Sequence, residues 1–253
     1  MLLECSGPVA RLTLNRPERH NSLVPELLHA LLAALAACER DDSIHVLVLA
    51  HAGPSFSTGG DVQAFYRQGD QIACYADELV DLLNQAILRI VSLGKPIIAA
   101  VDGRVTGGAL GLVLACDIVL VSALASFTPY YVDVGFSPDG GWSAMLPALI
   151  GPARARSVQL LNQSISAEQA VAWGMAATLI DSNDMAEQSM AMALTIAGKV
   201  AGSVQRTRVL LRPDRAQLAE ALERERALFL QQIVSIEAQQ GMQRFLFPRS
   251  QAA

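Results

Sequence analysis

Two glycine-rich turns constrain this sequence more than any other feature, because each joins a buried strand to the segment that leads into a helix. Residues 44–50 (IHVLVLA) and 97–101 (IIAAV) are nearly uninterrupted apolar runs, typical of strands buried on both faces. The first leads to FSTGGD at residues 56–61 and the second to VTGGALG at residues 105–111. Glycine lets a ligand approach the main chain, and N–H groups at a helix start are unpaired and favour negative charge. Brought together, two such turns would form an oxyanion hole.

Strands and helices alternate along most of the chain, as in an α/β protein. Besides the two apolar runs, the periodicity predicts a strand at residues 9–14, a helix beginning at Pro25, a second helix at residues 78–91, a strand at 118–121, an extended segment at 126–135 and a short strand at 177–180. From residue 185 no strand pattern recurs, and residues 215–240 predict one long helix. We therefore expect an α/β core at residues 1–195 and a helical region at residues 196–253 that packs against it.

Composition narrows the class of protein. Of the 253 residues, 52% are hydrophobic, yet no stretch offers the roughly 20 clean apolar residues of a membrane-spanning helix. We expect a soluble protein with a large subunit interface and no membrane partner. The net charge of −5 argues against nucleic acid as the main partner. Four scattered cysteines predict free thiols in a reducing cytoplasm, and four histidines without ligand spacing predict no metal site.

The two turns belong to a longer pattern that is similar to a known family. The matching segments are NRPERHNSL (residues 15–23), FSTGGD, KPIIAAVDGRVTGGALGLVLACDIVLVS (95–122), GFSPDGGWSAMLPALIG (135–151) and ISAEQAVAWGMAATLID (165–181). Together they resemble the enoyl-CoA hydratase/isomerase family, the crotonase superfamily, from about residue 3 to residue 247. The resemblance implies a ClpP-like spiral of ββα units. It also implies C-terminal helices that form trimers, often paired into hexamers.

The resemblance implies that the substrate is a thioester of coenzyme A and that no further cofactor is needed. Two main-chain N–H groups hold the thioester oxygen in this family, and the matching positions are Gly60 and Gly108. Removing a proton next to a thioester builds negative charge on that oxygen. Each preorganised donor contributes about 3–4 kcal/mol to lowering such a barrier.

The acid–base residues depart from the hydratase pattern. Where typical hydratases carry two glutamates, this chain has Gly111 and Tyr131. One acid remains at a position that some isomerases of the family use, Asp139 in SPDGGW. A single carboxylate can move a proton between C2 and C4, so the pattern favours a one-base isomerase. Asp139 can also be interpreted as a turn or cap residue, and Asp133 is a competing acid.

The resemblance also suggests substrate contacts. Arg19 is a candidate for the phosphates of coenzyme A, and Thr58 and Asp61 for the segment along which adenine lies, although Asp61 also fits a helix cap. Tyr131, Phe136 and Trp142 are expected to line the acyl pocket.

The sequence therefore predicts a cytoplasmic enoyl-CoA isomerase that forms a homotrimer or hexamer. Two alternatives stay open because both glutamates are missing. One is a hydratase, or another crotonase-type lyase or hydrolase, that works with unconventional residues such as Tyr131 or Asp133. The other is a protein that binds acyl-CoA without turning it over.

Overall fold

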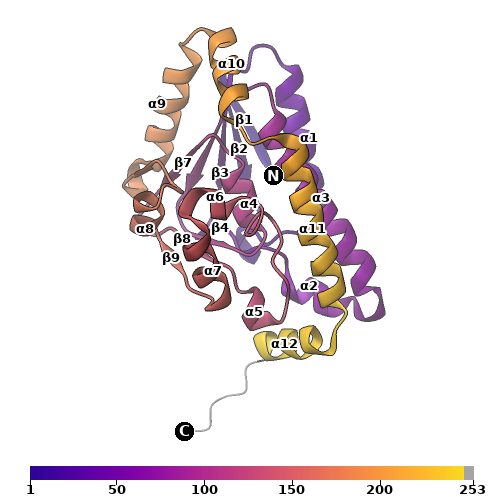
Figure 1. The fold of residues 1–253 in the computed structure, drawn as a ribbon. Coiled ribbons are helices and arrows are strands. Elements are labelled where there is room, and N and C mark those ends of the chain that lie inside the picture. Colours follow the sequence, from indigo (N-terminus) through magenta and orange to yellow (C-terminus); the bar gives the residue numbers. More distant parts are fainter. Residues whose placement is uncertain (248–253) are drawn as a thin grey trace.

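The computed structural model describes residues 1–247 and contains two β-sheets (Figure 1). From β3 to β8, successive strands belong to the two sheets in turn. The strands are β1 Leu2–Ser6, β2 Val9–Leu14, β3 Val46–His51, β4 Ser55–Ser57, β5 Ile97–Val101, β6 Arg104–Thr106, β7 Ile118–Val121, β8 Ser126–Thr128, β9 Ile165–Ser166 and β10 Thr178–Leu179. The larger sheet has the order β1-β2-β3-β5-β7-β10, and its neighbours are parallel except for the β1–β2 pair. The smaller sheet has the order β4-β6-β8-β9.

The apolar run in β3 is explained by burial on both faces. Leu47 and Leu49 belong to the main core, which includes residues of α1 and α3. Val46 and Val48 point the other way, into a second cluster with residues of α9. Because side chains alternate across a strand, a strand covered on both sides must be apolar throughout.

Twelve α-helices are present in the described residues. They are α1 Pro25–Arg40, α2 Val62–Arg67, α3 Ile72–Ser92, α4 Ala109–Leu114, α5 Tyr131–Val134, α6 Leu146–Ile150, α7 Pro152–Leu160, α8 Ala167–Ala172, α9 Met185–Ala197, α10 Ala201–Leu211, α11 Arg215–Ile233 and α12 Ile236–Leu246. Within residues 1–247, no helix is long and apolar enough to cross a membrane.

The predicted spiral of ββα units is confirmed. A strand of the larger sheet is followed by a short strand of the smaller sheet and then by a helix three times, as β3-β4-α2, β5-β6-α4 and β7-β8-α5. Strands β4 and β6 are parallel neighbours, with Ser55 opposite Arg104. Since each glycine turn follows one of these two strands, both turns lie at the same edge of the smaller sheet.

Two local predictions were wrong. The single helix expected over residues 215–240 is interrupted after Ile233, and α12 begins behind Ser235, whose Oγ accepts the N–H of Ala238 at 3.1 Å. The segment 126–135 is extended only as far as Thr128, and α5 follows.

The C-terminal helices close over the core. Helix α11 packs along α3, and α12 contacts α2 and α5 (Figure 1). The division of the chain at residue 195 stays a prediction. That position falls inside α9, and residues 248–253 of the expected helical region lie outside the described part.

Candidate active site

The two glycine turns pack against each other main chain to main chain. Gly59 has φ +70°, and a Cβ there would lie 2.6 Å from the carbonyl oxygen of Thr106. Gly60 and Gly108 both line the adjoining cavity, and neither N–H donates to an acceptor within residues 1–247. A preorganised pair of free N–H groups beside a cavity is the arrangement that stabilises a developing oxyanion.

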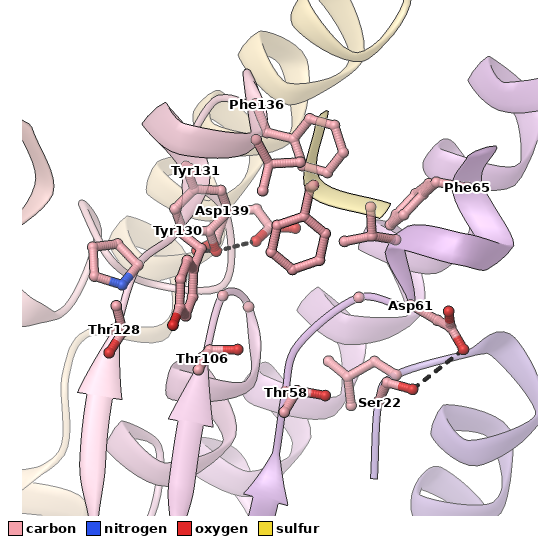
Figure 2. Close-up of a pocket in the computed structure, with 18 of the residues that line it drawn as sticks. Ser22, Thr58, Asp61, Phe65, Thr106, Thr128, Tyr130, Tyr131, Phe136 and Asp139 are labelled. Carbon is pink, nitrogen blue, oxygen red and sulfur yellow. Dashed lines mark hydrogen bonds between the residues drawn. The ribbon is translucent and has the colours of Figure 1, made fainter. Parts of the chain in front are cut away.

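The cavity beside these turns has a volume of about 900 Å³ (Figure 2). Its apolar wall is built from several helices and the loops beside them, and its members are Leu23, Val62, Phe65, Leu79, Val80, Leu83, Val134, Phe136, Phe229, Phe245 and Leu246. Phe65, Phe136 and Phe229 touch one another, with ring centroids 5.5–6.0 Å apart. This wall suits an apolar group such as an acyl chain.

Asp139 is one of two buried acids that line this cavity, with 7% of its surface exposed. A Cβ on Gly140 would lie 2.4 Å from Cα of Gly108, and one on Gly108 would lie 2.9 Å from Oδ1 of Asp139. The close approach of the two glycines therefore sets the carboxyl group directly beside the second glycine turn. Burial raises the pKa of Asp139 to about 7.

Tyr131 contacts Asp139 directly. Its hydroxyl lies 2.5 Å from Oδ1 and 3.0 Å from the main-chain oxygen of Asp139, as the dashed line in Figure 2 marks for the first contact. The hydrogen bond lowers the pKa of Asp139 and partly offsets the effect of burial, because it favours the ionised form. Burial raises the pKa of Tyr131 well above its usual value, so its hydroxyl keeps its proton.

Helix α5, which carries Tyr131, is held at both ends. Before its first residue, Tyr130 has φ +62°, rare for a side-chain-bearing residue, and its N–H donates to Oδ1 of Asn162 at 2.8 Å. At the last residue of the helix, α12 approaches so closely that a Cβ on Gly241 would lie 1.9 Å from the carbonyl oxygen of Val134. The left-handed residue and the close packing together position the tyrosine.

Neither position 111 nor Asp133 supplies a second carboxylate to the cavity. A Cβ at Gly111 would lie 2.3 Å from the carbonyl oxygen of Gly140 and 2.4 Å from Cδ1 of Ile87, so this backbone leaves no space for a glutamate. Asp133 is exposed, hydrogen-bonded to Asn162, and does not line the cavity.

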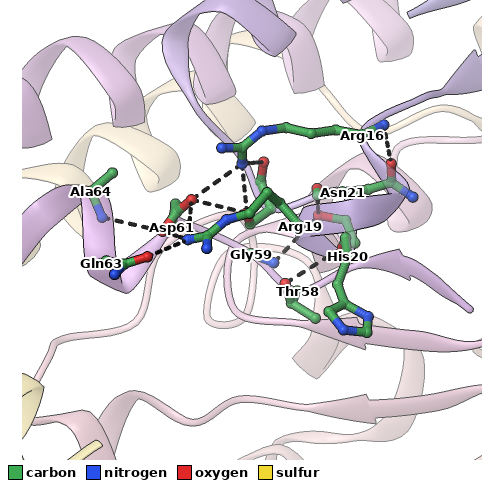
Figure 3. A network of polar contacts seen from close by, with 11 residues as sticks. Arg16, Arg19, His20, Asn21, Thr58, Gly59, Asp61, Gln63 and Ala64 are labelled. Carbon is green, nitrogen blue, oxygen red and sulfur yellow. Dashed lines mark hydrogen bonds and ion pairs between the residues drawn. The ribbon is translucent and has the colours of Figure 1, made fainter. Parts of the chain in front are cut away.

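A second region of the cavity carries charge, because Arg19 and Asp61 line it. Arg16 does not line the cavity but pairs with Asp61, and we call these three residues the arginine region (Figure 3). Asp61 accepts hydrogen bonds from Arg16 at 3.2 Å, from Arg19 at 3.0 Å and from the N–H of Ala64 at 3.1 Å. Burial alone would raise the pKa of Asp61, but the bonds from Arg19, Ala64 and Arg16 outweigh it and hold the pKa below its usual value. Asp61 is thus the N-cap of α2 as well as an ion-pair partner.

Of the remaining residues predicted to contact the substrate, three line the cavity and one does not. Thr58, Arg19 and Phe136 line the cavity. Trp142 does not, which corrects the expectation that it belongs to the acyl pocket. Its ring is completely buried, and its indole N–H donates to the carbonyl oxygen of Gly107 at 2.7 Å, so it supports the second glycine turn from behind.

Two residues that build the site escaped the sequence analysis. Asn162 carries no motif signal. Glu225 accepts the N–H of Gly141, in the turn that carries Asp139, at 2.8 Å. It lies in a helix rich in Glu and Arg, where nothing in the pattern separates a buried carboxylate from the exposed ones. Both act across the fold on segments far away in sequence, so no local signal could have identified them.

Comparisons with known proteins agree with this geometry. Residues 4–251 match the family model described as enoyl-CoA hydratase/isomerase. The chain belongs to this family. It is 36% identical over 192 residues to a 1,2-epoxyphenylacetyl-CoA isomerase of Escherichia coli (strain K12), covering 75% of this chain and 72% of the relative. It is 35% identical over 204 residues to a probable enoyl-CoA hydratase of Mycobacterium bovis, covering 78% and 72%.

Solved structures of the family share the whole fold. The crystal structure of an enoyl-CoA hydratase from Bacillus halodurans superposes with a TM-score of 0.90 at 25% identity, covering 96% of this chain and 98% of the other. The relatives include proteins named as isomerases and as hydratases. Membership of the enoyl-CoA hydratase/isomerase family therefore does not by itself distinguish between these two reactions.

Proposed function

We propose that this protein is an enoyl-CoA isomerase that shifts a double bond with one base, Asp139. The observation that carries the proposal is that Asp139 is the one buried carboxyl group which lines the described cavity without a cationic partner, beside Gly108. Asp61, the other buried acid of the lining, is occupied by two arginines and a helix N-terminus.

In the proposed reaction, ionised Asp139 removes a proton from C2 of a 3-enoyl thioester. The electron pair spreads into the thioester, and the N–H groups of Gly60 and Gly108 stabilise the charge on its oxygen. The protonated carboxyl then returns the proton at C4, which gives the conjugated 2-enoyl thioester and restores the carboxylate. A carboxyl group with a pKa of about 7 suits both halves of this exchange at neutral pH.

Hydration is the weaker candidate. It needs one group to activate water and another to manage the α-proton. Position 111 has no space for a carboxylate, and the Tyr131 hydroxyl is engaged with Asp139 at a raised pKa. A buried tyrosine that keeps its proton is a poor base for water.

The substrate in this proposal is an acyl-CoA with an apolar acyl group, because rings and aliphatic side chains form the inner wall of the cavity. Arg19, 41% exposed beside the cavity, is the candidate for the phosphates of coenzyme A. Since coenzyme A is part of the substrate, the proposed reaction uses no separate cofactor.

We also propose that the chain assembles as a homotrimer or hexamer. Large apolar side chains exposed on and next to α10 support this, because their burial between subunits would remove apolar surface from water: they are Val200, Val209, Leu210 and Leu211. Light scattering on the purified protein should give a mass of three or six chains, and a monomer would contradict the proposal.

The reaction is tested by incubation with a 3-enoyl-CoA, which should form the conjugated 2-enoyl-CoA with its characteristic absorbance. Asp139→Asn should reduce kcat about 10²–10⁴-fold, the usual contribution of a general base. Full activity of Asp139→Asn would rule out the proposed base. Rapid addition of water to crotonyl-CoA would favour the hydratase instead, and binding of acyl-CoA without any conversion would favour a non-catalytic role.

A further inference from the structure

Glu225, from α11, is a buried carboxylate beside the turn that carries Asp139. Only 4% of its surface is exposed. Its Oε2 accepts the N–H of Gly141 at 2.8 Å, while Oε1 accepts the N–H and the hydroxyl of Ser143, both at 2.7 Å, and the N–H of Ala144 at 2.8 Å. All four partners are donors, and a carboxylate that accepts such bonds is favoured in its ionised form. Burial has the larger effect and raises the pKa of Glu225, and the bonds from Ser143, Gly141 and Ala144 partly offset that rise.

The segment that Glu225 holds has no regular structure of its own. Gly140 and Gly141 follow Asp139 with φ +60° and +89°, two consecutive left-handed residues. Such a turn is adopted easily by glycine but is not rigid in isolation. Three main-chain N–H groups gathered on one carboxylate fix it, and they do so from a helix more than eighty residues further along the chain.

We propose that Glu225 is a positioning residue for Asp139, holding the turn at residues 139–144 and placing a negative charge near the catalytic carboxyl group. The proposal rests on the proposed function, in which Asp139 takes up and returns a proton. Glu225 touches neither the cavity nor the reacting atoms, so its effect passes through Asp139.

The charges around Asp139 are few. From α5 it faces the neutral hydroxyl of Tyr131, and from α11 the charge of Glu225. The sides formed by α3 and the second glycine turn present Leu83 and Gly108, which carry no charge. In the described residues no cation pairs with Asp139. Burial and the charge of Glu225 both raise the pKa of Asp139, and the hydrogen bond from Tyr131 lowers it.

The test separates charge from geometry with two variants. Glu225→Gln removes the charge but keeps the shape, and its carbonyl oxygen can accept the donors of Ser143 and Ala144. We expect the acid limb of the pH profile of kcat/KM to move to lower pH by about half a unit or more, because the ionised form of Asp139 is no longer repelled. Glu225→Asp keeps the charge but shortens the reach, so we expect kcat to fall at least about tenfold with the limb little changed.

Glu223→Gln is the matched control, since Glu223 lies on the same helix, is exposed and, within residues 1–247, pairs only with Arg226 at 2.7 Å. It should leave both kcat and the limb as in the wild type. Far-UV circular dichroism checks that each variant is folded.

A direct readout is the carbon NMR titration of aspartate-labelled protein, with the Asp139 signal assigned by its loss in Asp139→Asn. The midpoint should lie near 7 in the wild type and lower in Glu225→Gln. A wild-type midpoint near 4, the ordinary value for an aspartate, would overturn the proposal. So would a titration midpoint and an acid limb of kcat/KM that are the same in Glu225→Gln as in the wild type. If instead Asp139 is not the base, Asp139→Asn stays active while Glu225→Gln still lowers the midpoint, so the two failures are distinguishable.

Discussion

Two aspartates line the same cavity, and their surroundings are opposite. In the arginine region, Asp61 accepts bonds from two guanidinium groups and a helix N-terminus, which lower its pKa. Asp139 has a tyrosine hydroxyl as its side-chain partner and a second carboxylate nearby, and burial raises its pKa to about 7. A carboxylate held permanently ionised is suited to structure, whereas one poised near neutrality is suited to proton transfer.

The two regions are also built by different forces. Ion pairs and a helix cap assemble the arginine region, within reach of solvent at Arg19. Close main-chain contacts between glycines, and the packing of α12 on α5, assemble the surroundings of Asp139. Changes in side-chain volume should therefore affect the surroundings of Asp139 more than the arginine region.

The largest expected contrast is in stability as a function of pH. The folded pKa of Asp139 lies above the unfolded value of about 4, so the folded state binds the extra proton and loses stability as pH rises from about 4 to 7. Asp139→Asn should be more stable than the wild type at pH 8, by roughly 2–4 kcal/mol, and the difference should shrink steadily as the pH falls toward about 4.

Asp61→Asn should show the reverse. The folded pKa of Asp61 is depressed, so its contribution is present above the unfolded pKa and is lost as pH falls through the folded value. The variant should lose about 1–3 kcal/mol at pH 7, and less in acid. Urea unfolding at several pH values measures both, and equal pH dependences would remove the contrast.

Packing around Asp139 is tested next by Gly241→Ala. The added methyl group would lie 1.9 Å from the carbonyl oxygen of Val134, so α12 or α5 must shift. We expect a loss of about 1–3 kcal/mol in the free energy of unfolding and a clear fall in kcat, because α5 carries Tyr131. Gly202→Ala in α10 is the control and should leave kcat unchanged, because a Cβ there would meet only the end of the flexible Arg206 side chain. Unaltered kcat in Gly241→Ala would show that α5 tolerates displacement.

A smaller effect is expected for Tyr131→Phe. Loss of the hydroxyl removes the hydrogen bond that favours the carboxylate, so the pKa of Asp139 should rise. The acid limb of kcat/KM should move to higher pH, with about a tenfold fall in activity at pH 7 and a smaller one at pH 9. A shift to lower pH would mean that the tyrosine acts on the protonated form of Asp139 instead.

The smallest effect is expected for Arg19→Gln. Arg19 is 41% exposed, and solvated ion pairs contribute about 0–1 kcal/mol, so stability should hardly change. If Arg19 binds the phosphates of coenzyme A, KM for the thioester should rise a few-fold with kcat unchanged, and added salt should reduce the difference. A KM equal to that of the wild type at low salt would remove Arg19 from the substrate contacts.

Prediction from sequence succeeded where periodicity is strong. The strands β2, β5 and β7 begin and end where their apolar patterns do. It failed at α5 and at the break before α12. Tyr130 adopts a left-handed conformation that its residue type disfavours, and Asn162, far away in sequence, stabilises it. After residue 228 the apolar spacing continues without interruption, although Ser235 caps a new helix there. Tertiary contacts override local preference at such places.

By itself, the sequence determined the α/β order of the elements, the two glycine turns and the identity of one unusual acid, because periodicity and residue type are local properties. The folded arrangement was needed to show that the turns meet, that position 111 has no space for a glutamate and that Trp142 lies behind the turn rather than in the pocket. It also decided the difference between Asp61 and Asp139. A pKa depends on burial and on charges brought near by folding, and neither can be read from neighbours along the chain.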